Sequence, residues 1–223
     1  MRVWVASVKT EDGYELRRIA ESEMCRGITD LLLLGKLPIG QVLWGWRDLG
    51  GAGSVWMQRE FAAKAMLHGD YSDLLFVDSD IGAPVEAFQA LVAMNKPVAV
   101  GCYPTAEDQP VPATFRLHGP GDTGHPHLGV GVERIDWGGL GFALIKRSVF
   151  EQVPGPWFLG AGVNEDVTFF TKLRAAKIEV WCDYRIPLVH PYTVWLHREH
   201  MLQTAKYQAA ILAGRVEGKV LVQ

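Results

Sequence analysis

Apolar runs separated by polar, glycine-containing turns divide the chain into alternating extended and helical segments. Residues 74–77 (Leu-Leu-Phe-Val) are apolar without interruption, which indicates a strand covered on both faces of its sheet. Similar apolar and β-branched runs between turn residues predict the other extended segments. The full set comprises residues 2–8, 41–46, 73–77, 97–102, 114–117, 140–145, 178–182 and 186–189.

Helices are expected between most of these strands. Ser54 and Asn164 are suitable N-caps, and Pro84 stands where the first turn of a helix tolerates proline. The predicted helices cover residues 11–34, residues 54–68, a segment that opens at residue 84, residues 164–176 and residues 195–213. This alternation predicts an α/β fold whose sheet is mostly parallel in its first half.

One segment breaks the alternation. Residues 104–132 are rich in proline, glycine and histidine, and they hold only the short predicted strand at 114–117. Loops of this length inside a compact domain are uncommon, and they are often functional or mobile.

Composition favours one domain of ordinary size. The chain has 223 residues, of which 48% are hydrophobic, so it can bury a sizeable core. The net charge of -3 gives no global basic field for sequence-independent binding to nucleic acid. A local basic stretch near the C-terminus is either a solvated helix face or a tail that faces an acceptor or a phosphate. Its cations are Arg198, Lys206, Arg215 and Lys219.

Cysteine usage and hydropathy bear on the compartment. Cys25, Cys102 and Cys182 lie far apart without a CxxC pair, which favours packed thiols in a reducing environment. No apolar run reaches the length of about 18 residues that predicts a membrane span. The first residues lead directly into a strand rather than a signal peptide. We therefore expect a cytoplasmic protein without a transmembrane segment.

Two aspartates follow the most apolar predicted strand. Asp78 and Asp80, separated by Ser79, stand at its carboxyl end, the edge at which open α/β sheets bind ligands. Alternate residues of an extended segment point the same way, so both carboxylates can converge on one divalent cation. Magnesium or manganese held in this manner keeps coordination positions for phosphate oxygens. The alternative is a pair of surface aspartates before the helix at Pro84, one of them capping it.

A second acidic pair opens a predicted helix. Glu165 and Asp166 follow Asn164 and a glycine-containing loop at residues 157–162. Acids in a first turn are explained by the helix dipole alone. They also suit a general base presented from a rigid helix start, beside a loop that admits an acceptor. The spacing does not decide between the two readings.

Two further features carry weaker signals. His190 ends an extended apolar run and is either a structural histidine or a metal ligand. Gly138, Gly139 and Gly141 follow Trp137, whose ring could stack on a sugar or a base. These glycines either make a tight turn into a strand or allow a ligand to approach the backbone.

Four segments, in this order along the chain, are similar to one class of enzyme. They are DLLFVDSDIGAP, GGLGFALIKRSVFEQV, NEDVTFFTKLRAAKIEVWCD and IPLVH. With them the chain resembles the GT-A class of glycosyltransferases, particularly small family-2-like members of bacteria and phages. The resemblance implies a Rossmann-like, three-layer α/β/α fold with a mostly parallel central sheet.

The resemblance also implies a donor site. Asp78-Ser79-Asp80 matches the DxD motif of this class, in which the last acid ligates Mn²⁺ or Mg²⁺ directly and the motif binds the nucleotide-sugar donor. His190 matches the C-terminal histidine that completes the metal site. A UDP-sugar is the favoured donor, although the nucleotide is left open.

Further donor contacts are implied outside this motif. Ser7 and Val8 match the end of the first strand, which lies by the nucleotide. Arg59 matches an arginine that reaches the nucleotide or diphosphate, and Gly139 belongs to the glycine loop that flanks the donor.

The same resemblance implies the acceptor side. Glu165-Asp166 matches the xED motif, whose aspartate is the general base of inverting enzymes, and Glu165 is assigned to the acceptor as well. Gly138 and Trp137 are the remaining acceptor-binding candidates. We expect one domain over residues 1–223, with a donor half at 1–103, an acceptor half at 104–192 and a C-terminal helix and tail at 193–223.

Two other functions remain open on the sequence alone. One is a phosphotransfer enzyme of the haloacid-dehalogenase type, which also places two acids after a strand. The other is a nucleotide-sugar-binding module without catalysis. The acceptor of a transferase is equally open between a glycan, a lipid carrier, a protein and a hydroxymethylated base in phage DNA.

Overall fold

A computed structural model describes most of the predicted domain. The described residues are 2–8, 41–45, 55–78, 81–105, 110–119, 122, 124–159, 164–191 and 195–196. The helix expected at residues 11–34, the cap expected at Ser54 and the segment after residue 196 lie outside these ranges.

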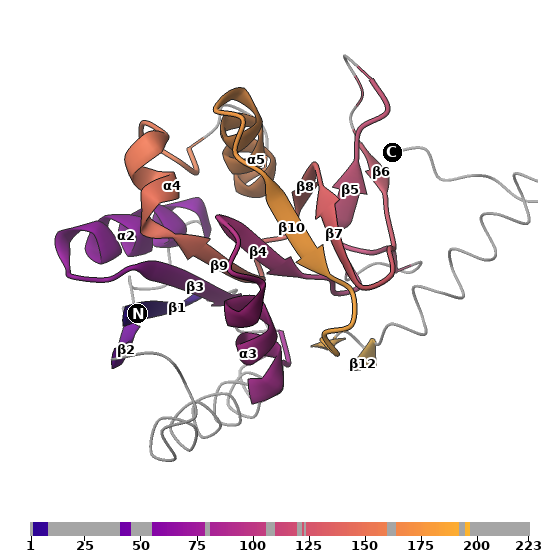
Figure 1. The fold of residues 1–223 in the computed structure, drawn as a ribbon, viewed down its shortest axis with the longest axis horizontal. Helices are drawn as coiled ribbons and strands as arrows, with labels where there is room; N and C mark the ends of the chain where they lie inside the picture. Colours follow the sequence, from indigo (N-terminus) through magenta and orange to yellow (C-terminus); the bar gives the residue numbers. More distant parts are fainter. Residues whose placement is uncertain are drawn as a thin grey trace, which may run out of the picture.

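A seven-stranded sheet forms the centre of the molecule (Figure 1). Its order is β2-β1-β3-β9-β4-β10-β7, and only β9 and β7 run antiparallel to their neighbours. The sheet is therefore mostly parallel, as predicted. Its strands are β1 (Arg2–Val8), β2 (Gln41–Gly45), β3 (Asp73–Asp78), β4 (Val98–Gly101), β7 (Val132–Ile135), β9 (Phe142–Lys146) and β10 (Val180–Asp183).

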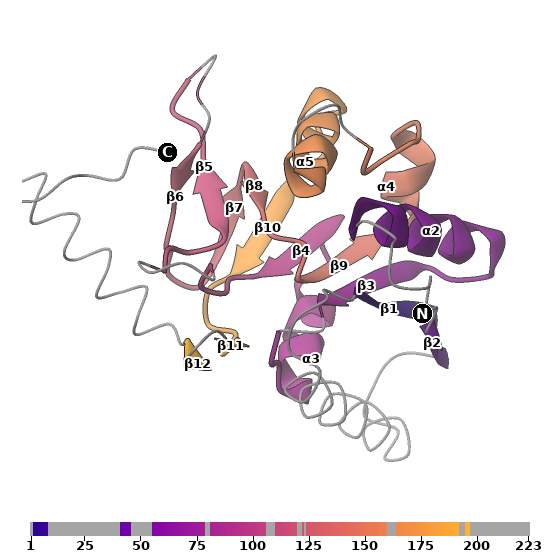
Figure 2. The same ribbon diagram turned by 180° about the vertical axis from the view of Figure 1, so that it is seen from behind.

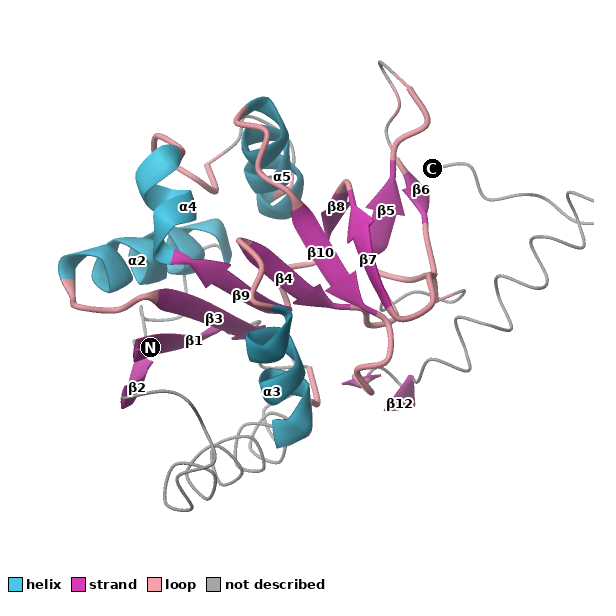
Figure 3. Cartoon of the chain, viewed as in Figure 1, coloured by secondary structure: helices cyan, strands magenta, loops and turns pink. Residues whose placement is uncertain are grey.

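Helices cover both faces of this sheet, which gives the three layers (Figures 1 and 2). Among the described residues, three helices lie on one face and α3 lies on the other. The helices are α2 (Val55–His68), α4 (Arg147–Gln152) and α5 (Glu165–Ala175) on the first face and α3 (Val85–Met94) on the second. The mixed α/β architecture matches the predicted fold class (Figure 3).

The sheet separates two apolar cores, and β3 contributes to both. Leu74 and Phe76 pack into the core beneath α2, α4 and α5, whereas Leu75 and Val77 pack beneath α3. Successive side chains of a strand point to opposite faces, so a strand buried on both sides needs apolar residues at every position. This explains the uninterrupted apolar run in the sequence.

Three elements differ from the expectation. The segment predicted as a strand at 186–189 forms only the isolated bridge between Val189 and Gly82. The predicted strand at 140–145 begins and ends later, and α4 follows it directly from Arg147, whose guanidinium binds four carbonyl oxygens around the end of α2. The helix expected from residue 195 is wrong at its start. Trp195–Leu196 is instead the strand β12, because it pairs with β11 (His190–Pro191).

A small second sheet accounts for much of the long excursion. It has the order β6-β5-β8 and consists of β5 (Thr114–Arg116), β6 (His125–Pro126) and β8 (Trp137–Gly138). The short strand predicted near residue 114 is therefore present, and it places β8 beside α5. Within the described ranges, no helix has the length and apolar character needed to cross a membrane.

Candidate functional site

Arg59 lies at the centre of a cluster of acidic side chains. Its guanidinium is 2% exposed and donates from Nη2 to Asp78 Oδ2 at 3.0 Å. Its Nε lies 3.5 Å from Glu165 Oε1 and 3.9 Å from Asp166 Oδ1. The end of β3 and the start of α5 therefore meet at a single buried cation supplied by α2.

The charge of this cluster fixes the protonation of Arg59. Burial alone would lower the pKa of the guanidinium, but the neighbouring carboxylates of Asp78, Asp166 and Glu165 raise that pKa above its ordinary value. Arg59 also donates from Nη1 to the carbonyl oxygen of Leu140 at 3.4 Å. It is thus a permanent positive charge that links three acidic residues to the glycine loop.

Asp166 has the environment of a general base. Its Oδ2 accepts the Leu140 backbone N–H at 3.2 Å, while its buried Oδ1 has no hydrogen-bond partner among the described residues. Burial raises the pKa of this carboxyl to about 7, and Glu165 and Asp78 add to the rise while Arg59 opposes it. A carboxylate with a pKa near neutrality suits proton abstraction.

The start of α5 is held by a local cap. The Asn164 side chain accepts the backbone N–H of Asp166 at 3.3 Å, which satisfies one of the free donors of the first turn. Glu60, next to Arg59 on α2, accepts the backbone N–H groups of Trp157 and Phe158. One turn of α2 thus orders the segment before α5 and supplies the cation of the site.

Asp78 closes β3 at the sheet edge. Its backbone N–H donates to the Gly141 carbonyl at 2.8 Å, and the register of the sheet sets Val8 beside Asp78 and Ser7 beside Val77. The ends of β1 and β3 therefore lie together, although the side chains of Ser7 and Val8 are not described. Ser79 and Asp80 lie outside the described residues.

The glycine loop packs against a tyrosine that the sequence did not single out. Gly141 N–H donates to Tyr103 Oη at 3.0 Å, and a Cβ on Gly139 would overlap that hydroxyl. A Cβ on Gly141 would stand 2.7 Å from Tyr103 Oη and 3.1 Å from Asp78 Oδ2. Glycine at these two positions makes room for Tyr103 beside Asp78.

The Tyr103 side chain is a neutral phenol in this buried position. Burial raises the pKa of its phenol well above the ordinary value, and Asp78 and Asp166 raise it further. No sequence pattern identified this residue, because a tyrosine after an apolar strand is an ordinary core residue. Tyr103 follows β4, and it lies beside the acids because β9 pairs between β3 and β4.

His190 lies on the other side of Tyr103. The two rings are 5.8 Å apart in an edge-to-face arrangement, and His190 Nδ1 donates to the Pro104 carbonyl at 2.9 Å. In a neutral ring this bond places the proton on Nδ1 and the lone pair on Nε2, the arrangement that metal-binding histidines commonly show. The backbone bridge between Gly82 and Val189 brings the segment after the predicted metal motif alongside His190.

The described acids around Arg59 outnumber the cation that they surround. Asp78, Glu165 and Asp166 carry three formal negative charges against the one positive charge of Arg59, and such an excess is relieved by Mg²⁺ or Mn²⁺. Within the described ranges, no three His, Cys, Asp or Glu side chains are arranged to hold a metal ion. Asp80, the predicted direct ligand, stands outside those ranges.

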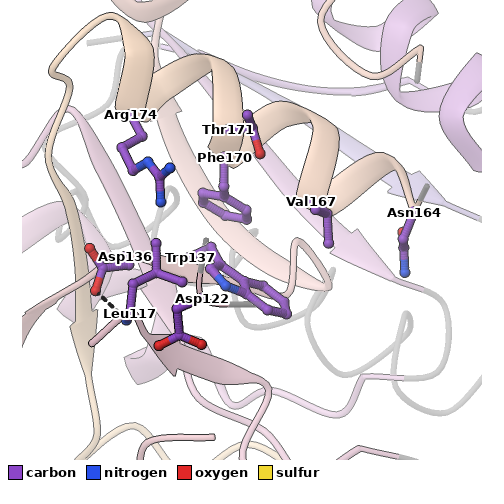
Figure 4. A pocket seen from close by; sticks show the side chains of 9 residues that line it. All are labelled: Leu117, Asp122, Asp136, Trp137, Asn164, Val167, Phe170, Thr171 and Arg174. Carbon is purple, nitrogen blue, oxygen red and sulfur yellow. Dashed lines mark hydrogen bonds between the residues drawn. The ribbon is translucent and has the colours of Figure 1, made fainter. Parts of the chain in front are cut away.

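A cavity of about 420 Å³ opens beside the start of α5 (Figure 4). Side chains of α5 line one side of this cavity. Trp137 of β8 and Asp136, the residue before β8, line the other side. Trp137 also stacks on Phe115, with ring centroids 3.7 Å apart and planes at 6°. The predicted acceptor residue Trp137 therefore lines a hollow next to Asn164, whereas Gly138 pairs with Thr114 in the small sheet.

Comparison with known proteins identifies the fold. No protein-family model matches the chain, and no curated protein matches it. The crystal structure of A197 from STIV is similar, with a TM-score of 0.58 and 22% identity over 86% of each chain. GalNAc-T7, crystallised with UDP, GalNAc and Mn²⁺, is similar with a TM-score of 0.56 and 10% identity.

The match to GalNAc-T7 covers 92% of this chain and 48% of the other, so the chain spans about half the length of that protein. At these identities the likeness bears on the fold alone. The chain has the mixed α/β fold of the GT-A nucleotide-sugar transferases.

Proposed function

We propose that the protein is a metal-dependent glycosyltransferase that moves a sugar from a nucleotide-sugar to an acceptor hydroxyl with inversion. One observation carries the proposal: Asp78 at the end of β3 and Glu165-Asp166 at the start of α5 meet around Arg59. The GT-A fold supports it, because the edge where β3 ends is where open α/β sheets bind their ligands. The same fold argues against the haloacid-dehalogenase alternative.

The donor would lie over the ends of β1 and β3. Asp78, Asp80 and His190 are the residues that would hold Mn²⁺ or Mg²⁺. A bound cation there would stabilise the negative charge that develops on the diphosphate as it leaves. The presence of UDP and Mn²⁺ in the GalNAc-T7 crystals supports a UDP-sugar as the first donor to test.

Asp166 would act on the acceptor. Its carboxylate, 17% exposed as a side chain, would take the proton of the acceptor hydroxyl, whose oxygen forms a bond to the anomeric carbon. The bond from that carbon to the diphosphate oxygen breaks in the same displacement, and the nucleoside diphosphate leaves with the electron pair. Attack from the face opposite the leaving group inverts the anomeric configuration, which NMR of the product measures directly.

The donor is tested by a thermal-shift screen of UDP-, GDP- and CDP-sugars with and without Mn²⁺. The proposal expects at least one nucleotide-sugar to raise the melting temperature, and to do so more strongly with the metal. A panel that produces no shift in either condition contradicts the assignment of the donor site.

The metal motif is tested by Asp80→Ala. This variant should lose the Mn²⁺-dependent shift and sugar transfer while its circular dichroism spectrum stays unchanged. Glu86→Gln is the matched control, because Glu86 is an exposed acid in the first turn of α3 and is not one of the acids around Arg59. Full transfer by Asp80→Ala would remove the metal from the proposal.

A further inference from the structure

We propose that the cavity between α5 and the small sheet binds the acceptor as an uncharged, polyhydroxylated oligosaccharide. The inference rests on the proposed function for its chemistry, and it selects one acceptor class among those that the sequence left open.

One face of α5 forms a wall that leads away from the base. Asn164, Val167, Thr171 and Arg174 line the cavity at helical spacings of three or four residues. Ten residues of helix extend about 15 Å, which accommodates more than one pyranose ring. The wall starts at Asn164, whose side chain holds the backbone N–H of Asp166. A chain bound along α5 would thus reach the first turn of the helix that also carries Asp166.

The opposite wall combines an aromatic ring with fixed carboxylates. One face of Trp137 is covered by Phe115, so the indole is held in place as a platform. Asp136 Oδ2 accepts Leu117 N–H at 2.9 Å, and Asp122 accepts two backbone N–H groups of its own loop. These bonds orient both carboxylates without using all of their lone pairs.

This lining matches the chemistry of sugars. Carboxylate oxygens accept hydrogen bonds from hydroxyl groups, and the side chains of Arg174, Thr171 and Asn164 can donate to hydroxyl oxygens. A few fixed polar groups around an apolar platform is the usual composition of a small-molecule site. The side chains drawn in Figure 4 show this mixture on the two walls.

The charge around the cavity disfavours a phosphate-bearing acceptor. A second hollow of about 370 Å³ shares the lining residues Asp136 and Arg174 with this cavity. Among the described residues that line the two hollows, three cations (Arg134, Arg174 and Lys177) stand against three anions (Asp122, Asp136 and Glu179). A phosphodiester backbone or a lipid-linked diphosphate would need an excess of cations.

A bulky side chain can fill the cavity without changing the acids around Arg59, which gives a test. Thr171 is an exposed groove residue, and Thr171→Trp should occupy the space that a sugar ring would take. Ala175→Trp is the matched control, because Ala175 is exposed on the same helix but does not line the cavity. Xylobiose, cellotriose and chitotriose serve as probes, with saturation-transfer NMR for binding and sugar transfer for activity.

We expect at least one saccharide to receive saturation from the wild-type protein and from Ala175→Trp, but not from Thr171→Trp. In transfer assays the groove variant should raise the KM for that saccharide by about tenfold or more, with a smaller effect on kcat. Binding of none of the saccharides, or equal binding by both variants, contradicts the inference, as does preferred transfer to a hydroxymethylated DNA duplex. Hydrolysis of the donor by the wild-type protein tests the proposed function separately.

Discussion

At the scale of single residues, the positive charge of Arg59 offsets the negative charge of Asp166. Asp166 is poorly hydrated and close to two other acids, and Arg59 is the cation that makes this crowding tolerable. The pair couples the end of β3 to the start of α5 through charge. Substitutions at either residue should therefore change activity and stability in a related way.

Replacing the base should abolish transfer and leave the fold intact. Asp166→Asn keeps an oxygen for the Leu140 N–H but cannot take a proton, so kcat should fall by roughly 10²–10⁴-fold, the usual contribution of a general base. Steady-state kinetics with a nucleotide-sugar and a saccharide acceptor measures the loss. A variant within about twofold of the wild-type kcat would remove Asp166 from its proposed role.

The activity should depend on pH through the same carboxyl. Because the pKa of Asp166 is raised to about 7, the base is protonated in acid, and kcat/KM for the acceptor should rise through that pH. A pH-rate profile between weakly acidic and weakly basic conditions checks this. A flat profile across neutrality would show that another group removes the proton.

Stability should have the opposite dependence on pH. The folded pKa of Asp166 lies above its ordinary value of 3.8, so the folded state binds a proton that the unfolded chain releases in the interval between 3.8 and about 7. The free energy of unfolding should therefore fall as pH rises through this window. Asp166→Asn should reduce that dependence, and urea unfolding at several pH values measures it.

Removing the central cation should destabilise the protein strongly. Arg59→Ala leaves three acids close together without their partner, and the loss of one member of a buried ion pair costs about 3–5 kcal/mol. Combining it with Asp166→Asn should recover part of that loss. Chemical denaturation of the single and double variants tests the coupling, and purely additive free energies would contradict it.

At the scale of elements, the site depends on how β9 enters the sheet. This antiparallel strand lies between β3 and β4 and carries the glycine loop to Asp78, Tyr103 and Asp166 at its start. At this junction Gly139 leaves no room for a Cβ beside the Tyr103 hydroxyl. It offers a test that does not touch the acids.

Gly139→Ala should disturb the junction. Its Cβ would overlap the Tyr103 hydroxyl, and the phenol is too deeply buried to move freely, so overpacking of about 1–3 kcal/mol is expected. Tyr103→Phe in the same chain should relieve part of the overlap. If Gly139→Ala alone leaves the melting temperature unchanged, the packing described for this junction is wrong.

The sequence predicted the strongly patterned elements and missed several of the short ones. Continuous apolar character was enough to place β3 and β4, and the Asn164 cap placed the start of α5 within one residue. By contrast, α4 is only six residues long, too short to show a periodic pattern, and β12 is defined by its pairing with His190. Local patterns cannot identify elements whose stability comes from tertiary partners.

At the scale of the whole molecule, the sheet order assembles the site from distant segments. Arg59, Tyr103, Leu140 and Asp166 come from four elements or loops, and none of these contacts is local in the sequence. Motif spacing could identify the acids as candidates, but it could not reveal Arg59 as their shared partner or Tyr103 as the residue between Asp78 and His190. Those roles follow from topology.

The most direct measurement is release of nucleoside diphosphate from a UDP-sugar in the presence of Mn²⁺. We expect release from the wild-type protein, loss of release in EDTA and recovery when Mn²⁺ is added in excess. Asp80→Ala should show none of the metal-dependent release, and Glu86→Gln should match the wild type. Undiminished release in EDTA, or no release from any UDP-, GDP- or CDP-sugar with Mn²⁺ and a saccharide acceptor present, would contradict a metal-dependent glycosyltransferase.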